Sequence, residues 1–249
     1  MKYDACMSNG PEERDPAEPS APPEPIAPWF HTVFLLIILM LWATYSTLRL
    51  NLNLPPSATS HYVSYTSSII MQCLLVGSTI AGLYHRRQFI CSVLGSLSPQ
   101  NLARDIALGI ATYLGALSLV GLLGHVIRFI PLTHRTDVVR AMAPQSLPEL
   151  ALWIVVSLAA GICEEFVFRG YLQQQLTRWF RAVPLAIGLC SLLFGCLHFY
   201  QGTAGVLQVI ALGIIYGIVA AWRGNLRSVM IAHFLQDAIT GTAIYMHYH

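Results

Sequence analysis

Long apolar stretches separated by short polar segments run through most of this chain. About seven of them can be read as membrane-crossing helices, near residues 29–48, 63–84, 105–127, 149–171, 183–200, 204–222 and 226–245. A helix needs about 20 mainly apolar residues to cross the hydrocarbon core of a bilayer. The pattern therefore predicts an all-α fold, a multi-pass helical membrane bundle of about seven transmembrane helices that occupies residues 29–249.

The first 28 residues differ in composition from the rest of the chain. Residues 1–28 hold seven of the fourteen prolines and six of the twelve acidic residues. Such a segment cannot bury a core, so we expect it to be a disordered tail. It also lacks the positively charged start of a signal peptide, so cleavage is not expected.

Composition and charge narrow the class of protein. Apolar residues make up 55% of the 249 residues and charged residues only 10%, against about 25% charged residues in soluble domains. The formal net charge is +2 and no basic cluster with interleaved aromatic residues occurs, so nucleic acid is rejected as a partner. Arginine and lysine favour alternate connecting segments, which predicts an amino terminus on the inner side of the membrane. Membrane lipid is the expected surrounding.

The chain is organised around Cys163–Gly170, with the sequence CEEFVFRG, inside the apolar run 149–171. A charged group inside a bilayer costs roughly 2.5–3.5 kcal/mol on insertion scales, so such groups persist where they pair or take part in function. Glu165 and Arg169 are spaced i,i+4 and can pair on one helix face. Glu164 points about 100° away around the helix and lacks that partner. The spacing predicts one structural acid beside one available acid.

Polar side chains also interrupt two later apolar runs. His198 follows Phe194 by four residues, and His233 precedes Asp237 by the same spacing, so each pair shares a helix face. A lone histidine in a membrane helix is often only bonded to a neighbouring helix, and a carboxylate–arginine pair is often a structural clamp. A functional site is favoured because these groups can meet Glu164 at one buried point in a compact bundle.

Three motifs thus occur in succession, each in an expected span: Glu164-Glu165…Arg169, Phe194…His198 and His233…Asp237. In this order they resemble the CAAX prenyl endopeptidase type II family, also called CPBP or Abi intramembrane proteases. The resemblance covers the motif core at residues 149–240. The earlier spans are similar only in being apolar helices and carry none of the motifs. Family members often have eight helices, so a last helix is expected to be absent here. The last motif position is commonly Asn in the family, whereas this chain has Asp237.

The resemblance implies an intramembrane endopeptidase that hydrolyses a peptide bond within or near the membrane. Glu164 and His198 would activate the attacking water, and His233 and Asp237 would stabilise the tetrahedral intermediate. Asp237 donates to an oxyanion only when it is protonated; otherwise it accepts from His233. We prefer the donor role, because the sequence names no cationic partner for Asp237. The other motif residues are expected to support the site: Glu165, Arg169 and Phe194.

A zinc site is the competing interpretation of the same residues. Glu164, His198 and His233 would make a His2Glu set of the kind known from catalytic zinc sites, and the family is widely called a metalloprotease family for this reason. No H-E-x-x-H helix is present, although that motif is usual in zinc peptidases. Carboxylate–histidine catalysis without metal also fits the spacing, so we expect no obligatory cofactor.

Two other classes of function remain open. Glu164 and His198 could form the proton relay of a transporter, or the chain could be a non-catalytic scaffold or immunity protein. The presence of all four polar positions favours an active peptidase, with a peptide or membrane protein as substrate. Processing of prenylated CAAX proteins is implied by the resemblance alone.

Distances along the helices pose one geometrical problem. Glu164 and His198 are each about 17 residues from the expected turn near Arg181, which places both about 25 Å from it. His233 is only seven residues into the last span. We expect tilt or an unwound segment to bring them to one depth.

Overall fold

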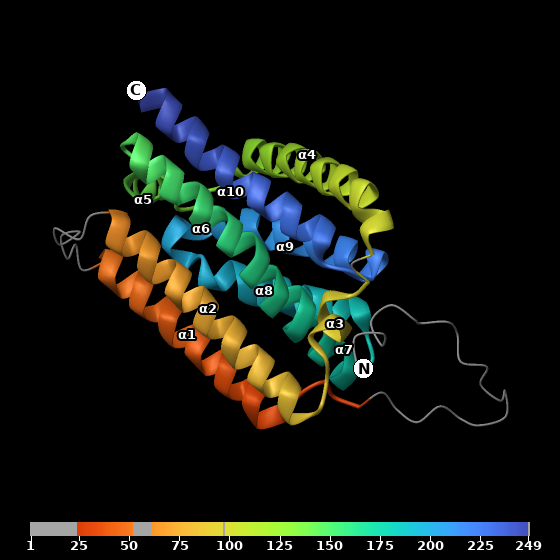
Figure 1. Cartoon of the computed structure of the whole chain (residues 1–249). Coiled ribbons are helices and arrows are strands. Elements are labelled where there is room, and N and C mark those ends of the chain that lie inside the picture. The colour runs from red at the N-terminus through yellow and green to blue at the C-terminus, as the bar shows by residue number, and fades with distance from the viewer. Residues whose placement is uncertain (1–23, 52–60, 97, 249) are drawn as a thin grey trace, which may run out of the picture.

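The structure, a computed structural model, describes residues 24–51, 61–96 and 98–248, with side chains except at residues 49–51 and 248. Every named element in these ranges is a helix (Figure 1). In chain order they are α1 Trp29–Asn51, α2 His61–His85, α3 Ile90–Leu94, η2 Pro99–Asn101, α4 Leu102–Ile127, α5 Thr136–Met142, α6 Leu147–Glu165, η3 Phe166–Leu172, α7 Gln173–Phe180, α8 Val183–Leu197, η4 Phe199–Gln201, α9 Gly202–Arg223 and α10 Arg227–Tyr248. The predicted all-α class is confirmed for the described residues.

Fewer helices than the seven predicted are both long enough and apolar enough to cross a membrane. Five helical runs meet both criteria among the described residues: Trp29–Leu48, His61–His85, Pro99–Ile127, Leu147–Phe180 and Phe199–Arg223. The predicted fifth and seventh spans are present as α8 and α10 but are not among them. α8 has only 15 residues, or about 22 Å, and α10 carries several polar residues. The count of seven is therefore not confirmed.

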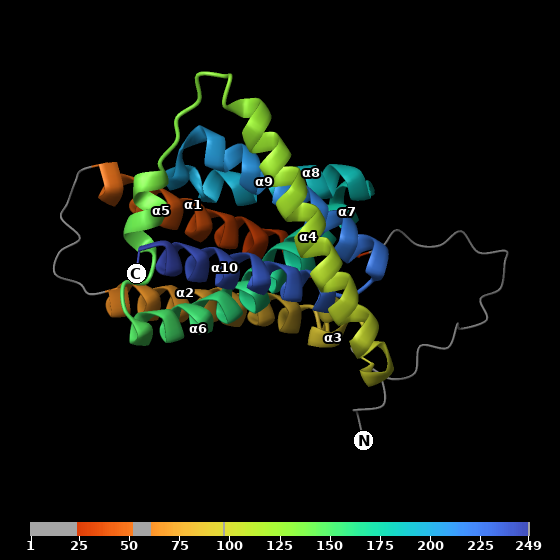
Figure 2. The same ribbon diagram turned by 90° about the horizontal axis from the view of Figure 1, so that it is seen from above.

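The helices pack as a bundle in which α10 contacts both α6 and α4. α2 packs on α6, α6 on α10, and α10 on α4, while α8 and α9 pack along each other (Figures 1 and 2). Figure 2 shows α4 crossing its neighbours at a steep angle. Leu94 accepts a backbone hydrogen bond from Leu226, which ties α3 to the connection between α9 and α10. We call this end of the bundle, which also carries α7, the α7 end.

The acidic motif lies in one long helical run that changes its winding. α6, η3 and α7 follow one another without a break from Leu147 to Phe180. The run begins at Ser146, whose side chain accepts from the backbone N–H of Glu149, and it ends where Arg181 adopts a left-handed φ of 53°. The η3 segment is π-helical and all of its residues are buried. π-helical turns are frequent at functional sites, and this one follows directly on the two acids.

Small residues allow close helix contacts around the motif. The Gly213-x-x-x-Gly217 pattern of α9 is typical of a close-packing helix face, and α9 does pack closely there. A Cβ added at Gly213 would lie 3.0 Å from the Cβ of Ser191 in α8. On α6, a Cβ at Gly161 would lie 2.8 Å from the carbonyl oxygen of Met230. These approaches set α8 and α10 close to the motif.

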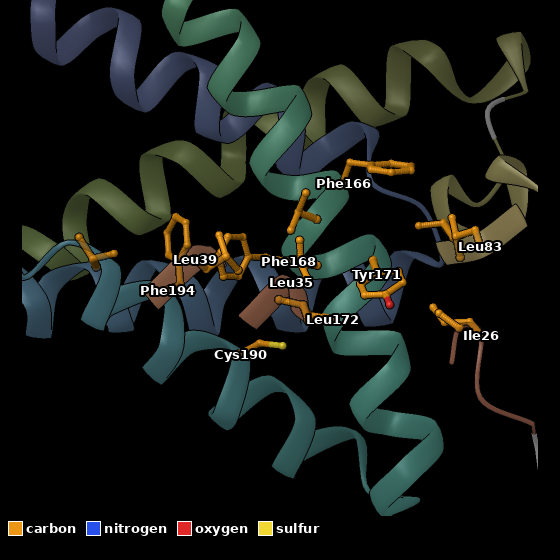
Figure 3. Close-up of a cluster of buried hydrophobic side chains, with 14 residues drawn as sticks. Ile26, Leu35, Leu39, Leu83, Phe166, Phe168, Tyr171, Leu172, Cys190 and Phe194 are labelled. Carbon is orange, nitrogen blue, oxygen red and sulfur yellow. The ribbon is translucent and has the colours of Figure 1, made fainter. Parts of the chain in front are cut away.

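The largest apolar cluster joins η3 to α1, α2 and α8 (Figure 3). Phe168 and Phe194 meet edge to face in it, with ring centroids 4.9 Å apart. Ile26 and Ala27, which belong to the expected tail, are buried and donate their backbone N–H groups to Gln175 of α7. Residues 24–28 therefore pack with the bundle rather than with a disordered tail. The prediction of disorder for residues 1–23 lies outside the described residues.

Candidate active site

The four residues predicted to act on the substrate come from three helices and lie together. Glu164 belongs to α6, His198 caps the end of α8, and His233 and Asp237 belong to α10. Nε2 of His233 lies 3.9 Å from Oε2 of Glu164 and 3.6 Å from Oδ2 of Asp237. Glu164 also interacts electrostatically with His198. The tertiary structure thus brings together all four side chains.

The catalytic candidates lie at one depth because α10 begins partway along the long helix 147–180 and not at its end. Gly170 lies beside Leu226, just before α10 begins: a Cβ on Gly170 would be 3.0 Å from the Leu226 Cδ1 atom. Glu164 and His233 are each about two turns from that level, so they face each other. Beyond that level the chain continues through α7, then turns and returns along α8, which brings His198 back toward Glu164. No unwound segment interrupts residues 147–180, so unwinding of this run, one of the two expected explanations beside tilt, is not needed.

Glu165 is the centre of a buried chain of charges. Its Oε1 accepts from Arg169 at 2.8 Å, which confirms the predicted i,i+4 pair. The same oxygen also lies 2.8 Å from Nδ1 of His233. The Glu165 side chain is 0% exposed, and Arg169 donates further to the carbonyl oxygen of Gly213. A buried carboxylate needs such partners to remain charged. Glu165 therefore links Arg169 to His233, a candidate catalytic histidine.

The contacts of His233 define how its ring is presented. The Glu165 carboxylate accepts a hydrogen bond from Nδ1 of His233, so Nδ1 carries a proton. The other ring nitrogen, Nε2, faces Glu164 and Asp237. Carboxylate oxygens therefore face both ring nitrogens. Such surroundings favour an imidazolium, which donates from both nitrogens. The ring of Tyr216 lies 5.9 Å away and closes another side.

His198 is oriented by the backbone of its own helix. Its Nδ1 lies 2.8 Å from the carbonyl oxygen of Phe194, so Nδ1 is the donor and Nε2 is left for the site. The Phe194 ring lies 4.9 Å from the His198 ring and 6.1 Å from that of His233. The guanidinium of Arg169 lies 4.6 Å from the Phe194 ring centroid. Phe194 thus packs among the guanidinium of Arg169 and the two imidazole rings.

Glu164 and Glu165 differ in accessibility, as their positions around the helix predict. The Glu164 side chain is 25% exposed, in contrast to Glu165. Its Oε1 accepts a hydrogen bond of 3.3 Å from Nε2 of Gln72 in α2. Oε2 is directed toward His233. Glu164 is therefore the acid that a water molecule or a substrate can reach.

The Asp237 side chain is 36% exposed, more than those of Glu164 at 25% and His233 at 8%. Its backbone carbonyl accepts from the indole N–H of Trp153 at 3.0 Å, which fixes this turn of α10 against α6. Its carboxylate lies next to His233. The tertiary structure thus supplies a partner that can be cationic, which sequence reasoning does not identify.

Two polar residues at the site do not follow from the motifs. Gln72 lies in the middle of α2, and its signal in the sequence is an amide inside the apolar run 69–75. The ring of Tyr200 lies 5.7 Å from that of His198, and Tyr200 interacts electrostatically with Glu164. Its hydroxyl accepts from the side chain of Gln201 at 3.2 Å. A search for acidic, basic and histidine side chains in apolar runs passes over both residues.

The three predicted zinc ligands are not grouped as a metal site. Among the described residues, no group of three His, Cys, Asp or Glu side chains is placed so that it could hold a metal ion. This includes the set Glu164, His198 and His233. In addition, Nε2 of His233 faces two carboxylates, which favours a proton on that nitrogen over a lone pair. The residues do not fit a zinc site in this arrangement.

Comparison with known proteins identifies a family for the segment that carries the motifs. Residues 146–239 match the family described as type II CAAX prenyl endopeptidase Rce1-like. This segment nearly coincides with the predicted motif core at 149–240, and the resemblance is confirmed over it. A stretch of 102 residues is 31% identical to the uncharacterized protein YpbD of Bacillus subtilis (strain 168). The matched stretch makes up 40% of this chain and 48% of YpbD. The chain thus spans about half the length of this curated relative. No solved structure matches.

Proposed function

Because residues 146–239 match the type II CAAX prenyl endopeptidases, we propose that the protein is an intramembrane endopeptidase. It would be a multi-pass membrane hydrolase that cleaves a peptide bond of a membrane-associated substrate. The observation that carries the proposal is the meeting of Glu164 with His198 and His233 within an apolar helical bundle. A carboxylate and imidazoles at one point are the groups that activation of water requires.

In this proposal, Glu164 is the general base. Its carboxylate takes a proton from a water molecule while the water oxygen bonds to the carbonyl carbon of the substrate. His198 presents Nε2 to the same water, because its Nδ1 is bonded to the Phe194 carbonyl. The proton taken by Glu164 then passes to the leaving amine when the C–N bond breaks. The partial exposure of Glu164 supports this role.

His233 supplies positive charge where the oxyanion develops. Glu165 holds its Nδ1–H, and Asp237 lies beside its Nε2. Donors that are fixed before the reaction are worth more than mobile ones. We assign to Asp237 the role of a carboxylate that favours the charged imidazole. This replaces the donor role preferred from the sequence, because a cationic partner is now at hand.

Replacement of Asp237 by asparagine is expected to lower kcat by roughly a hundredfold, as when an oxyanion donor is lost, because His233 loses the carboxylate that favours its charged form. Asn keeps the size of the side chain and can still accept a hydrogen bond, but it removes the negative charge beside His233. The measurement is kcat of the purified wild-type and Asp237→Asn proteins in detergent over a range of pH. Unchanged or higher kcat, with a weaker decline at high pH, would instead support the donor role.

Chelators are expected to leave peptide cleavage unchanged. The proposed steps use side chains alone, and the described residues do not group as a metal site. The measurement is activity after prolonged dialysis against a strong chelator, with elemental analysis of the dialysed protein. Loss of activity that returns when zinc is added would overturn the metal-free mechanism and restore the set Glu164, His198 and His233 as ligands.

The family match favours a peptidase over the alternatives of a proton-coupled transporter and a non-catalytic scaffold or immunity protein. The family description names CAAX prenyl endopeptidases, which suggests processing of a prenylated carboxy terminus. We propose it for this chain together with residence in a bacterial inner membrane.

Cleavage of a peptide library, read by mass spectrometry, tests the proposed function directly. The wild-type protein is purified in detergent and incubated with the library, beside Glu164→Ala purified in the same way. New peptide ends are expected only with the wild-type protein. Equal cleavage by both preparations would show that the activity belongs to a contaminant, and no cleavage by either would contradict the proposal.

A further inference from the structure

An amide from α2 reaches the catalytic acid from outside the segment that matches the family. Gln72 lies near the middle of α2 and is only 7% exposed. Its Nε2 donates to Oε1 of Glu164 at 3.3 Å. The family match begins at residue 146, so nothing in the matched motifs assigns a role to this residue.

The direction of this hydrogen bond limits what Gln72 does to Glu164. A carboxylate only accepts hydrogen bonds, so the amide must turn its NH2 group toward Glu164. This bond holds Oε1, while Oε2 points toward His233. The carboxylate is thereby kept in one orientation, with one oxygen available to a water molecule.

The other atom of the same amide is left without a partner. Oε1 of Gln72 is buried and makes no hydrogen bond within the described residues. A buried acceptor without a partner is costly, and native proteins satisfy most such groups. Because Oε1 and Nε2 share one carbon atom, Oε1 also lies next to the Glu164 carboxylate. A donor bound beside Glu164 would satisfy it.

We propose that Gln72 positions Glu164 through Nε2 and accepts, through Oε1, a backbone N–H of the peptide bound for cleavage. This rests on the proposed endopeptidase function. The backbone N–H groups inside a helix are already bonded to its own carbonyl groups. Beyond the first turn of a helix, only an extended or unwound segment has an N–H to give, so the substrate class is a peptide whose helix is opened at the cleavage site.

Two substitutions and one control test the role of Gln72. Gln72→Met removes both polar atoms at similar length, and Gln72→Glu keeps the size but replaces the donor with an acceptor. Thr79→Val is the control, because Thr79 is also buried in α2 but its hydroxyl donates only to the Leu75 carbonyl of its own helix. The readouts are kcat, KM and the unfolding temperature in detergent, with the library peptide that the wild-type protein cleaves fastest.

We expect both Gln72 variants to lose about 10- to 100-fold in kcat/KM, the range seen when partners that orient a reactive group are removed. Their unfolding temperatures should stay close to that of Thr79→Val, which should cleave like wild type. If Gln72→Met fails to fold, the isosteric Gln72→Glu carries the test. Cleavage by a folded Gln72 variant within twofold of wild type would overturn the positioning role.

N-methylation of single amides in the same peptide tests the contact with substrate. At one position near the cleaved bond, the methyl group should lower kcat/KM of the wild type about tenfold but leave Gln72→Met nearly unaffected, since the acceptor is already missing. Equal losses in both proteins at every position would overturn the contact. A wild-type protein that cleaves no peptide would overturn the endopeptidase function, and the role of Gln72 with it.

Discussion

Replacement of Glu164 by alanine is expected to abolish peptide cleavage while the protein stays folded. A general base contributes about 10²- to 10⁴-fold to the rate, and Glu164 is the only one of the two motif acids with an accessible carboxylate. Its side chain is one-quarter exposed and receives one long hydrogen bond from Gln72. Its removal therefore leaves no buried cation without a partner. The loss should appear in kcat and not in the unfolding temperature.

The measurement compares wild type, Glu164→Ala and Glu164→Gln in a cleavage assay and in thermal unfolding, both in detergent. Glu164→Gln keeps the size of the side chain but cannot take a proton from water, so it should be as inactive as Glu164→Ala. The control is Cys163→Ala, which trims the neighbouring position of α6 and should cleave normally. An active Glu164→Gln protein would remove Glu164 from the role of base.

Replacement of Glu165 by alanine is expected to damage both stability and activity. Glu165 is fully buried and bonds to Arg169 and His233 through one oxygen. Removal of one partner from a buried ion pair costs about 3–5 kcal/mol, because the other charge is left unpaired. At 2–4 °C for each kcal/mol in a chain of this size, the unfolding temperature should fall by roughly 6–20 °C. Activity should fall as well, since His233 loses the acceptor at Nδ1.

A double variant separates these two effects of Glu165. In Glu165→Leu/Arg169→Met, both charges of the pair are replaced by apolar groups of similar size, a change that is often neutral for stability. Thermal unfolding should return close to the wild-type value, whereas cleavage should stay low because nothing holds Nδ1 of His233. A double variant that is both stable and fully active would reduce Glu165 to a structural clamp. A stable single variant, Glu165→Ala, would contradict the cost assigned to the unpaired Arg169.

Relations within one helix could be predicted from the sequence. The i,i+4 spacing of Glu165 and Arg169 predicts their ion pair, and the 100° step between neighbours predicts that Glu164 faces elsewhere; both hold. Helix positions follow from the apolar runs, because a backbone in lipid must satisfy its hydrogen bonds within the helix. Apolarity alone, however, did not predict that α8 would be short or that residues 24–28 would pack against α7.

Relations between helices depended on the tertiary structure. No local pattern links Glu165 to His233, which are 68 residues apart, or Gln72 to Glu164, which are 92 apart. The contact between Glu165 and His233 depends on where Gly161 and Gly170 let α10 and its preceding loop approach the long helix, and the contact of Gln72 depends on the packing of α2 on α6. The sequence by itself determined the helical class, the motif and the separation of the two acids, because helix geometry is local. The tertiary structure decided the depth of the site, the charge surrounding His233 and the amide on Glu164, because these depend on which helices pack together and at what level.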